Sequence, residues 1–368
     1  MNAQRLGTIV RLELTQRTRS VAWYILLGVF ALLLVIVTAL SFMAFSWSDR
    51  EQGSAIYSTI VYITLLLVVL VSPTLSGNSI NGDRDAATLA PVQVTLATTA
   101  DIIVGKFLAA WITGLAFVAV SIPFLVIATL SGGADAATIT VSLLVLIVEV
   151  GIIAAIGVAL SGVIARPLFS VATTYLVVAA LVIGTPIAFA LVGATMRTEQ
   201  TYNNRSIDWE SYEEDGEFPC MPGESPSDDY PCVQDPSPEC GEWSTYTNEV
   251  PRFDRVWWIL AANPFVILAD ATPTTFDANG YPVDLFGQIK LGIRAAQEPP
   301  ADEVTWDECS PQSMEDQQPT PEEIIAQSTP SWFVGLGLQI LLAAGLLWWA
   351  WSRTSTPARR LPPGTRIA

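Results

Sequence analysis

The residues of this chain whose types and spacing suggest a specific interaction form one short charged segment, residues 82–89. It reads GDRDAATL and lies between two apolar runs that are each long enough to cross a membrane. Acidic residues at 83 and 85 favour a short helix here, because carboxylates stabilise a helix N-terminus. Such a helix would present Asp83, Arg84 and Asp85 to water, where a soluble partner could push on them. The candidate coupling residues are Gly82, Asp83, Arg84, Asp85, Thr88 and Leu89.

A second block, VGKFLA at residues 104–109, follows the first and opens the next apolar run. Its candidate residues are Gly105 and Lys106. In this order, the two blocks resemble the cytoplasmic loop and third-span entry of permease subunits of type-2 ABC exporters. That family's loop reads roughly Gly, acidic, basic, acidic, any residue, Gly, Thr, Leu, and Ala87 stands here where the family usually has Gly.

The resemblance implies a set of partners. Two permease halves, either two copies of this chain or this chain and a paralogue, would form a path for an amphipathic or lipid-like substrate. Two cytoplasmic ATPase subunits would dock at residues 83–89 and would bind the ATP, so no cofactor is expected on this chain. The sequence contains no histidine and no G-x-x-x-x-G-K-[ST] loop, which excludes histidine-based catalysis and a P-loop nucleotide site. We therefore expect a non-catalytic subunit with no metal site that does not bind nucleic acid.

The composition is that of an integral membrane protein, with 51% hydrophobic and 14% charged residues and a mean hydropathy of +0.45. We expect an all-α polytopic membrane protein with six transmembrane helices. The spans are predicted at residues 23–45, 56–76, 107–130, 139–164, 169–196 and 332–351, the first five lying within a unit of residues 21–195 that includes the coupling loop, 78–106.

Lysine and arginine predict the orientation of the spans, because they concentrate in cytoplasmic loops. They occur before the first span, in the coupling loop, between the fourth and fifth spans, and in the basic tail, 352–368. Both termini are therefore expected in the cytoplasm. Residues 1–20 are predicted to form an amphipathic elbow helix on the membrane surface, where Arg5, Arg11 and Arg17 can reach lipid phosphates. The alternative is an ordinary basic flank. High Ala and Val usage suggests a bacterial plasma membrane.

Residues 196–331 are predicted to form an acidic extracellular domain, with 27 Asp or Glu against 6 Lys or Arg. All four cysteines lie in it, which suggests two disulfides with three possible pairings. A thiolate metal site is disfavoured, because there is no C-x-x-C and no histidine. The first part, 197–250, shows no convincing periodicity, and 298–327 is expected to be mainly disordered. The cysteines are Cys220, Cys232, Cys240 and Cys309.

An apolar run at residues 256–269 is too short for an ordinary span and is interrupted by Asn263-Pro264. A seventh span would place the arginine-bearing tail outside, against the positive-inside pattern. The run is therefore expected to be an interfacial or re-entrant helical hairpin, or else the buried core of the outer domain.

Glu149 lies near the middle of the fourth span, where a charged group costs about 2.5–3.5 kcal/mol. It is a candidate for the translocation path or for a hinge. The alternative is a protonated glutamate hydrogen-bonded to Ser121, Thr173 or Thr185.

The sequence leaves two functions open. The first is the exporter permease that the resemblance implies. The second is a membrane-anchored sensor or scaffold whose acidic outer domain binds a cationic ligand without transport, since a strongly negative domain attracts cations within a Debye length of about 8 Å.

Overall fold

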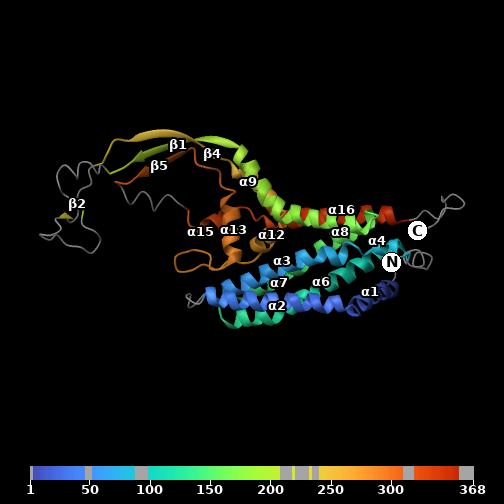
Figure 1. Ribbon diagram of the computed structural model, residues 1–368. Helices are drawn as coiled ribbons and strands as arrows, with labels where there is room; N and C mark the ends of the chain where they lie inside the picture. The colour runs from blue at the N-terminus through green and yellow to red at the C-terminus, as the bar shows by residue number, and fades with distance from the viewer. Residues whose placement is uncertain are drawn as a thin grey trace.

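The computed structural model in Figure 1 describes residues 3–45, 52–87, 98–207, 240–309 and 319–355. It also gives the backbone of two short paired strands, β2 (Phe218–Pro219) and β3 (Cys232–Val233). Most of the described residues are helical.

Six helices are long and apolar enough to cross a membrane, which confirms the predicted number of spans. They are α2 (Val21–Ala44), α3 (Gln52–Ser76) continuing into α4 (Asn81–Asp85), α6 (Thr99–Leu130), α7 (Ala136–Val163), the series α8 (Pro167–Ala179), η1 (Ala180–Gly184) and α9 (Thr185–Thr195), and α16 (Trp332–Thr354). The third span begins earlier than predicted because Thr98 and Asp101 form a capping box at the start of α6. Gly105 and Lys106 therefore lie inside this helix rather than at its entry.

The bundle is centred on α3 and α7, the two most deeply buried spans. Large side chains such as Tyr57, Ile60 and Phe117 are fully buried between the helices. The spans at the periphery of the bundle keep broad apolar faces exposed; Leu176 of α8 and Leu191 of α9 are examples. Such faces suit lipid, because acyl chains are as apolar as the side chains themselves.

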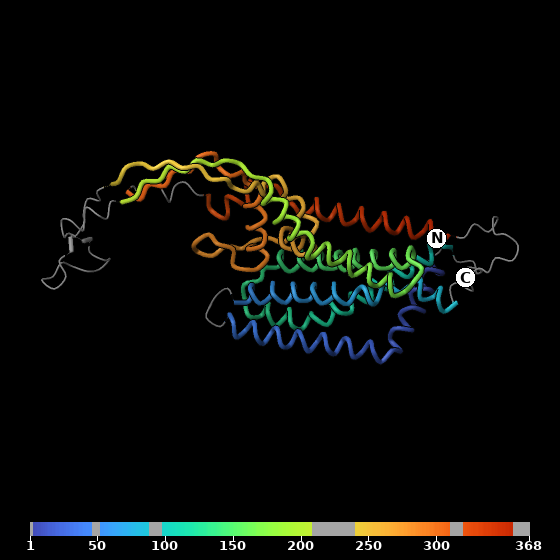
Figure 2. Tube along the Cα trace, turned by 45° about the horizontal axis from the view of Figure 1, so that its top comes forward, coloured from blue at the N-terminus to red at the C-terminus, as the bar shows by residue number. Residues whose placement is uncertain are grey.

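The two ends of the bundle differ. Helix α4 and the last residues of α16 lie at one end, and the described strands and short helices between residues 197 and 327 lie at the other (Figures 1 and 2).

Two short helices, α11 (Trp258–Ala261) and α12 (Pro264–Ala271), form the apolar run before the last span. They meet at the predicted break, where the side chain of Asn263 accepts a hydrogen bond from Phe265 N. The amide Nδ2 of Asn263 also donates to Val182 O at 2.9 Å and to Thr185 Oγ1 at 3.0 Å. These bonds join the break to the π-helical turn η1 of the fifth span, and the interior of α12 is buried against α7 and α16.

The structure is mostly helical, as predicted, but the segment between the fifth and sixth spans, residues 196–331, also contains strands. Three strands form a sheet of order β4-β1-β5, as Figure 1 shows. Strand β1 (Arg197–Arg205) pairs antiparallel with β4 (Ser244–Pro251) and parallel with β5 (Glu303–Asp307). The prediction of disorder at 298–327 is wrong at two places, since it contains β5 and helix α15 (Pro321–Gln327), which begins with a Thr320–Glu323 capping box. Helix α13 (Leu285–Ala295) precedes β5.

One of the possible disulfides is present. Cys240 and Cys309 are bonded, and they lie just before β4 and just after β5. The side chains of Cys220 and Cys232 lie outside the described residues. The bond closes a loop of 69 residues across the sheet, and cross-links of this kind typically stabilise a fold by about 2–4 kcal/mol.

Candidate functional site

Helix α4, the described part of the first charged block, is fixed to the end of α7 by polar contacts. The hydroxyl of Ser161 accepts hydrogen bonds from Ile80 N at 2.8 Å and Asn81 N at 3.1 Å, and it donates to Asn81 Oδ1. The amide Nδ2 of Asn81 donates to Ile164 O. Since Ser161 and Asn81 are fully buried, a displacement of α4 must carry the end of α7 with it.

Lys106 brings the two sequence blocks together. Its Nζ lies 2.6 Å from Asp83 Oδ2 of α4 and 2.5 Å from Glu13 Oε1 of α1 (Ala3–Thr18), and the lysine is only 3% exposed. One buried ammonium therefore connects α1, α4 and α6.

Gly105 explains why α1 can approach so closely. A Cβ at this position would lie 2.7 Å from Ile9 Cγ2 of α1, so a larger residue would push the two helices apart. Gly105 and Lys106 thus act together: the first allows the contact between α1 and α6, and the second supplies its charge.

The exposed surface of α4 differs from the expectation. Asp83 is held by Lys106, and the Arg84 guanidinium approaches Gly162 O at 3.4 Å, so both turn partly towards the protein. Asp85, Ala86 and Ala87 are exposed. Asp83 and Arg84 are therefore only partly exposed, because α6 and α7 also offer them partners. Thr88 and Leu89 lie outside the described residues.

Ala87 is the one described non-glycine residue with a positive φ, at 57°. It follows α4 at the position where a left-handed residue, usually glycine, commonly ends a helix. This is also the position at which the exporter-permease pattern has glycine. The backbone here therefore has the conformation expected of that glycine, although the residue is alanine.

Replacing Ala87 with glycine is expected to stabilise the end of α4. A left-handed conformation costs an L-residue about 1–2 kcal/mol, and the extra freedom of glycine in the unfolded chain returns about 0.4–1 kcal/mol of that. The amides of α4 should then exchange with deuterium about twofold to fivefold more slowly. Ala86→Gly is the matched control, because Ala86 has a φ of −76° and gains no relief. Equal or faster exchange in Ala87→Gly would contradict this account.

The basic residues of α1 do not all face outwards. Arg17 donates from Nη2 to Leu75 O at 2.9 Å, and burial lowers the pKa of its guanidinium. The expectation that Arg17 reaches lipid phosphates is therefore wrong, since it caps the carbonyl end of α3 instead. Arg11 remains exposed along the helix.

Glu149 is completely buried on α7. In the described part of the chain neither carboxylate oxygen has a hydrogen-bond partner. The three hydroxyls considered from the sequence instead donate to carbonyls of their own helices: Ser121, Thr173 and Thr185. Gln339 of α16, another buried polar side chain of the bundle, donates from Nε2 to Ala262 O.

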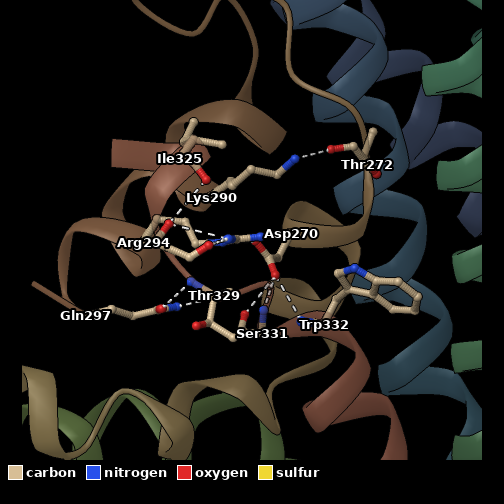
Figure 3. A network of polar contacts seen from close by, with 10 residues as sticks. Asp270, Thr272, Lys290, Arg294, Gln297, Ile325, Thr329, Ser331 and Trp332 are labelled. Carbon is tan, nitrogen blue, oxygen red and sulfur yellow. Dashed lines mark hydrogen bonds and ion pairs between the residues drawn. The ribbon is translucent and has the colours of Figure 1, made fainter. Parts of the chain in front are cut away.

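A second polar cluster, at the opposite end of the bundle, was not predicted (Figure 3). Asp270 at the end of α12 is buried and accepts hydrogen bonds from Arg294 Nε at 2.6 Å, Ser331 N at 2.6 Å and Trp332 N at 2.9 Å. The Ser331 hydroxyl donates to the same carboxylate at 3.0 Å. Arg294 Nη1 donates in turn to Ser328 O. We call these residues the Asp270 cluster, and they join α12 and α13 to the first residues of the sixth span.

Neighbouring contacts extend the Asp270 cluster. Lys290 Nζ donates to Thr272 O at 2.5 Å, and burial lowers the pKa of this lysine. Gln297 exchanges two hydrogen bonds with the backbone of Thr329. The sequence did contain a signal for the Asp270 cluster. Asp270 directly follows the apolar run of residues 256–269, and Ser331 directly precedes the last span.

No protein-family model matches this chain, and no curated protein matches it. The functional argument therefore rests on the geometry of these sites.

Proposed function

We propose that this chain is the membrane-spanning permease subunit of a type-2 ABC exporter. The observation that carries the proposal is the Glu13–Lys106–Asp83 contact at the end of the bundle opposite the sheet β4-β1-β5. The two blocks on which the resemblance depends are separate in the sequence and are joined there by one buried lysine. The left-handed conformation of Ala87 adds a second point of agreement.

In this proposal a cytoplasmic ATPase subunit docks on the exposed end of α4, at Asp85, Ala86 and Ala87. Its motion on ATP binding is passed on by two rigid contacts. The Ser161–Asn81 bonds carry it to α7, and Lys106 carries it to α6 and α1. Two permease halves would then alternately open a path for an amphipathic or lipid-like molecule, with the second half a copy of this chain or a paralogue.

Purification from the native host tests this proposal. Tagged wild-type protein is expected to bring down a partner with vanadate-sensitive ATPase activity, whereas Asp85→Lys is expected to lose that partner. Asp85 is the better probe than Arg84, because Asp85 is exposed, whereas the Arg84 guanidinium approaches Gly162 O of α7. Glu322→Lys, an equal charge reversal on exposed α15 at the other end, is the matched control and should retain the partner. Wild-type protein that comes down without any ATPase would reject the proposal in favour of the sensor or scaffold.

Glu149 is proposed as a polar contact of the translocation path. Glu149→Gln is expected to fold with a stability within about 1 kcal/mol of wild type, because the amide has the shape of the carboxyl group without its charge. Transport is expected to fall about tenfold, as for the loss of one buried polar contact. Transport by Glu149→Gln at the wild-type rate, with normal expression, would remove Glu149 from the path.

A further inference from the structure

The sheet β4-β1-β5 has two chemically different faces. Directly paired residues of neighbouring strands point to the same side, and successive residues of one strand alternate between sides. The observed register pairs Arg205 with Asp307 and Glu199 with Glu249. It places every charged residue of the three strands on one side, which we call the charged face: Arg197, Glu199, Arg205, Glu249, Glu303 and Asp307.

The opposite side, which we call the aromatic face, carries all three aromatic residues of the strands. Tyr202 is paired with Tyr246, and the two rings stack with centroids 5.4 Å apart at an angle of 7°. Trp306 is paired with Asn204 in the next row. Tyr246 and Trp306 are each 47% exposed. The other polar residues of this face are uncharged: Thr198, Gln200, Asn204, Ser244 and Asn248.

The sheet is held together by contacts between side chains of its three strands. Asn203 accepts a hydrogen bond from Thr245 Oγ1 of β4 and donates one to Glu303 of β5, so it ties all three strands together on the charged face. The Cys240–Cys309 disulfide fixes the outer ends of β4 and β5. The aromatic side chains are therefore positioned before any ligand arrives, which lowers the entropic cost of binding.

The composition of the aromatic face selects among possible occupants. A bilayer is unsuitable, because the sheet extends beyond the end of the helical bundle (Figures 1 and 2). An obligate contact with a second copy would be rich in aliphatic residues, but this face contains only Val250 and Val304. The aromatic face combines the apolar surfaces of its rings with neighbouring amides and hydroxyls. Such a surface fits a ligand that has both apolar and hydroxyl groups.

We propose that the aromatic face binds a neutral polysaccharide outside the membrane. A pyranose ring has a flat C–H surface that can stack on Tyr246, Tyr202 or Trp306. Its hydroxyls can bond to the amides of Asn204 and Asn248. The absence of charge from this face means that no ionic group is required of the sugar. Each stacked ring contributes little, so binding depends on several sugar units engaging the face at once. This inference does not depend on the proposed transport function.

Co-sedimentation with insoluble polysaccharides tests the inference. The full-length chain is reconstituted in nanodiscs, because sugar-headed detergents would compete for the site. The probes are cellulose, chitin and cross-linked dextran, with polylysine-agarose as a cationic probe. Trp306→Ala and Tyr246→Ala are compared with Trp243→Ala. Trp243 is the matched control, since it is 48% exposed and its ring lies 5.7 Å from the Arg205 guanidinium of the charged face.

Wild type is expected to sediment with at least one neutral polysaccharide. Trp306→Ala and Tyr246→Ala should each bind about tenfold more weakly, and Trp243→Ala should bind like wild type. An intact Cys240–Cys309 bond in each variant checks that the sheet has formed. If wild type binds none of the three polysaccharides, the inference is overturned. It is also overturned if Trp243→Ala weakens binding as much as Trp306→Ala and Tyr246→Ala do. Binding to polylysine alone, reduced by Glu249→Gln, would assign the sheet to a cationic ligand instead.

Discussion

Asp270→Asn is expected to lower the free energy of unfolding by about 3–5 kcal/mol. The carboxylate and its partner Arg294 are both buried, with side-chain exposures of 0% and 5%. Asparagine keeps the shape but leaves the guanidinium without its counter-ion, and an uncompensated buried charge is among the most costly defects in a fold. The Ser331 and Trp332 amides at the start of α16 also lose a charged acceptor. Thermal unfolding of the protein in nanodiscs, followed by intrinsic fluorescence, measures the effect.

An exposed ion pair of the same outer segment is the matched control for Asp270→Asn. Arg197 and Glu249 are 3.7 Å apart, with side chains 56% and 66% exposed, so Glu249→Gln should change the stability by less than about 0.5 kcal/mol. Combining Asp270→Asn with Arg294→Gln should cost less than the sum of the two single changes, because the second removes the unpaired charge. Additive costs, or an Asp270→Asn protein as stable as Glu249→Gln, would show that the Asp270 cluster does not hold the sixth span.

The spans were predictable because each one is specified locally. A run of about twenty apolar residues has few alternatives to a membrane helix, whatever surrounds it. The helix boundaries are not given by the apolar runs alone. The early start of α6, for example, depends on the cap formed by Thr98 and Asp101, which lie outside the apolar run. That signal, a threonine followed three residues later by an acid, was present in the sequence.

The outer sheet was missed because its strands do not alternate between apolar and polar residues. A strand with one buried face shows that alternation, whereas β4 is exposed on both faces and β1 is largely half-buried on both. The charged residues of β1, which are Arg197, Glu199 and Arg205, all lie at alternate positions on one face of the strand. A hydropathy profile does not detect such a pattern. A search for charged residues confined to alternate positions would have detected it.

The candidate site was only half accessible from the sequence. The two blocks could be identified by residue type, but nothing local shows that Lys106 pairs with Asp83 and Glu13, since the three residues lie on different helices. The same holds for Arg84, whose inward direction depends on the carbonyl of Gly162 at the end of α7. Which residues of different helices meet is decided by how the helices pack. The sequence alone does not contain that packing in a readable form.

Lys106→Met is expected to loosen the contacts of α1 and α4 with α6 and, in the proposed exporter, to abolish coupling to the ATPase subunit. Methionine fills much of the buried volume but leaves Glu13 and Asp83 facing each other without a cation, and their side chains are only 13% and 36% exposed. Breaking a buried ion pair in this way costs about 3–5 kcal/mol, and the partial exposure of Asp83 places the expected loss at about 3 kcal/mol. Both the midpoint of thermal unfolding and the stimulation of ATP hydrolysis by substrate should fall.

Two further variants separate the charge of Lys106 from its packing. Adding Glu13→Gln to Lys106→Met should recover part of the stability, because it removes one of the two opposed carboxylates. Gly105→Ala should loosen the same contact without altering any charge, since its Cβ would meet Ile9 of α1. If Lys106→Met uncouples ATP hydrolysis and Gly105→Ala does so as well, the contact of α1 with α6 transmits the motion. If Lys106→Met leaves both stability and coupling unchanged, the joined blocks do not form the coupling site, and the central support for an exporter permease is lost.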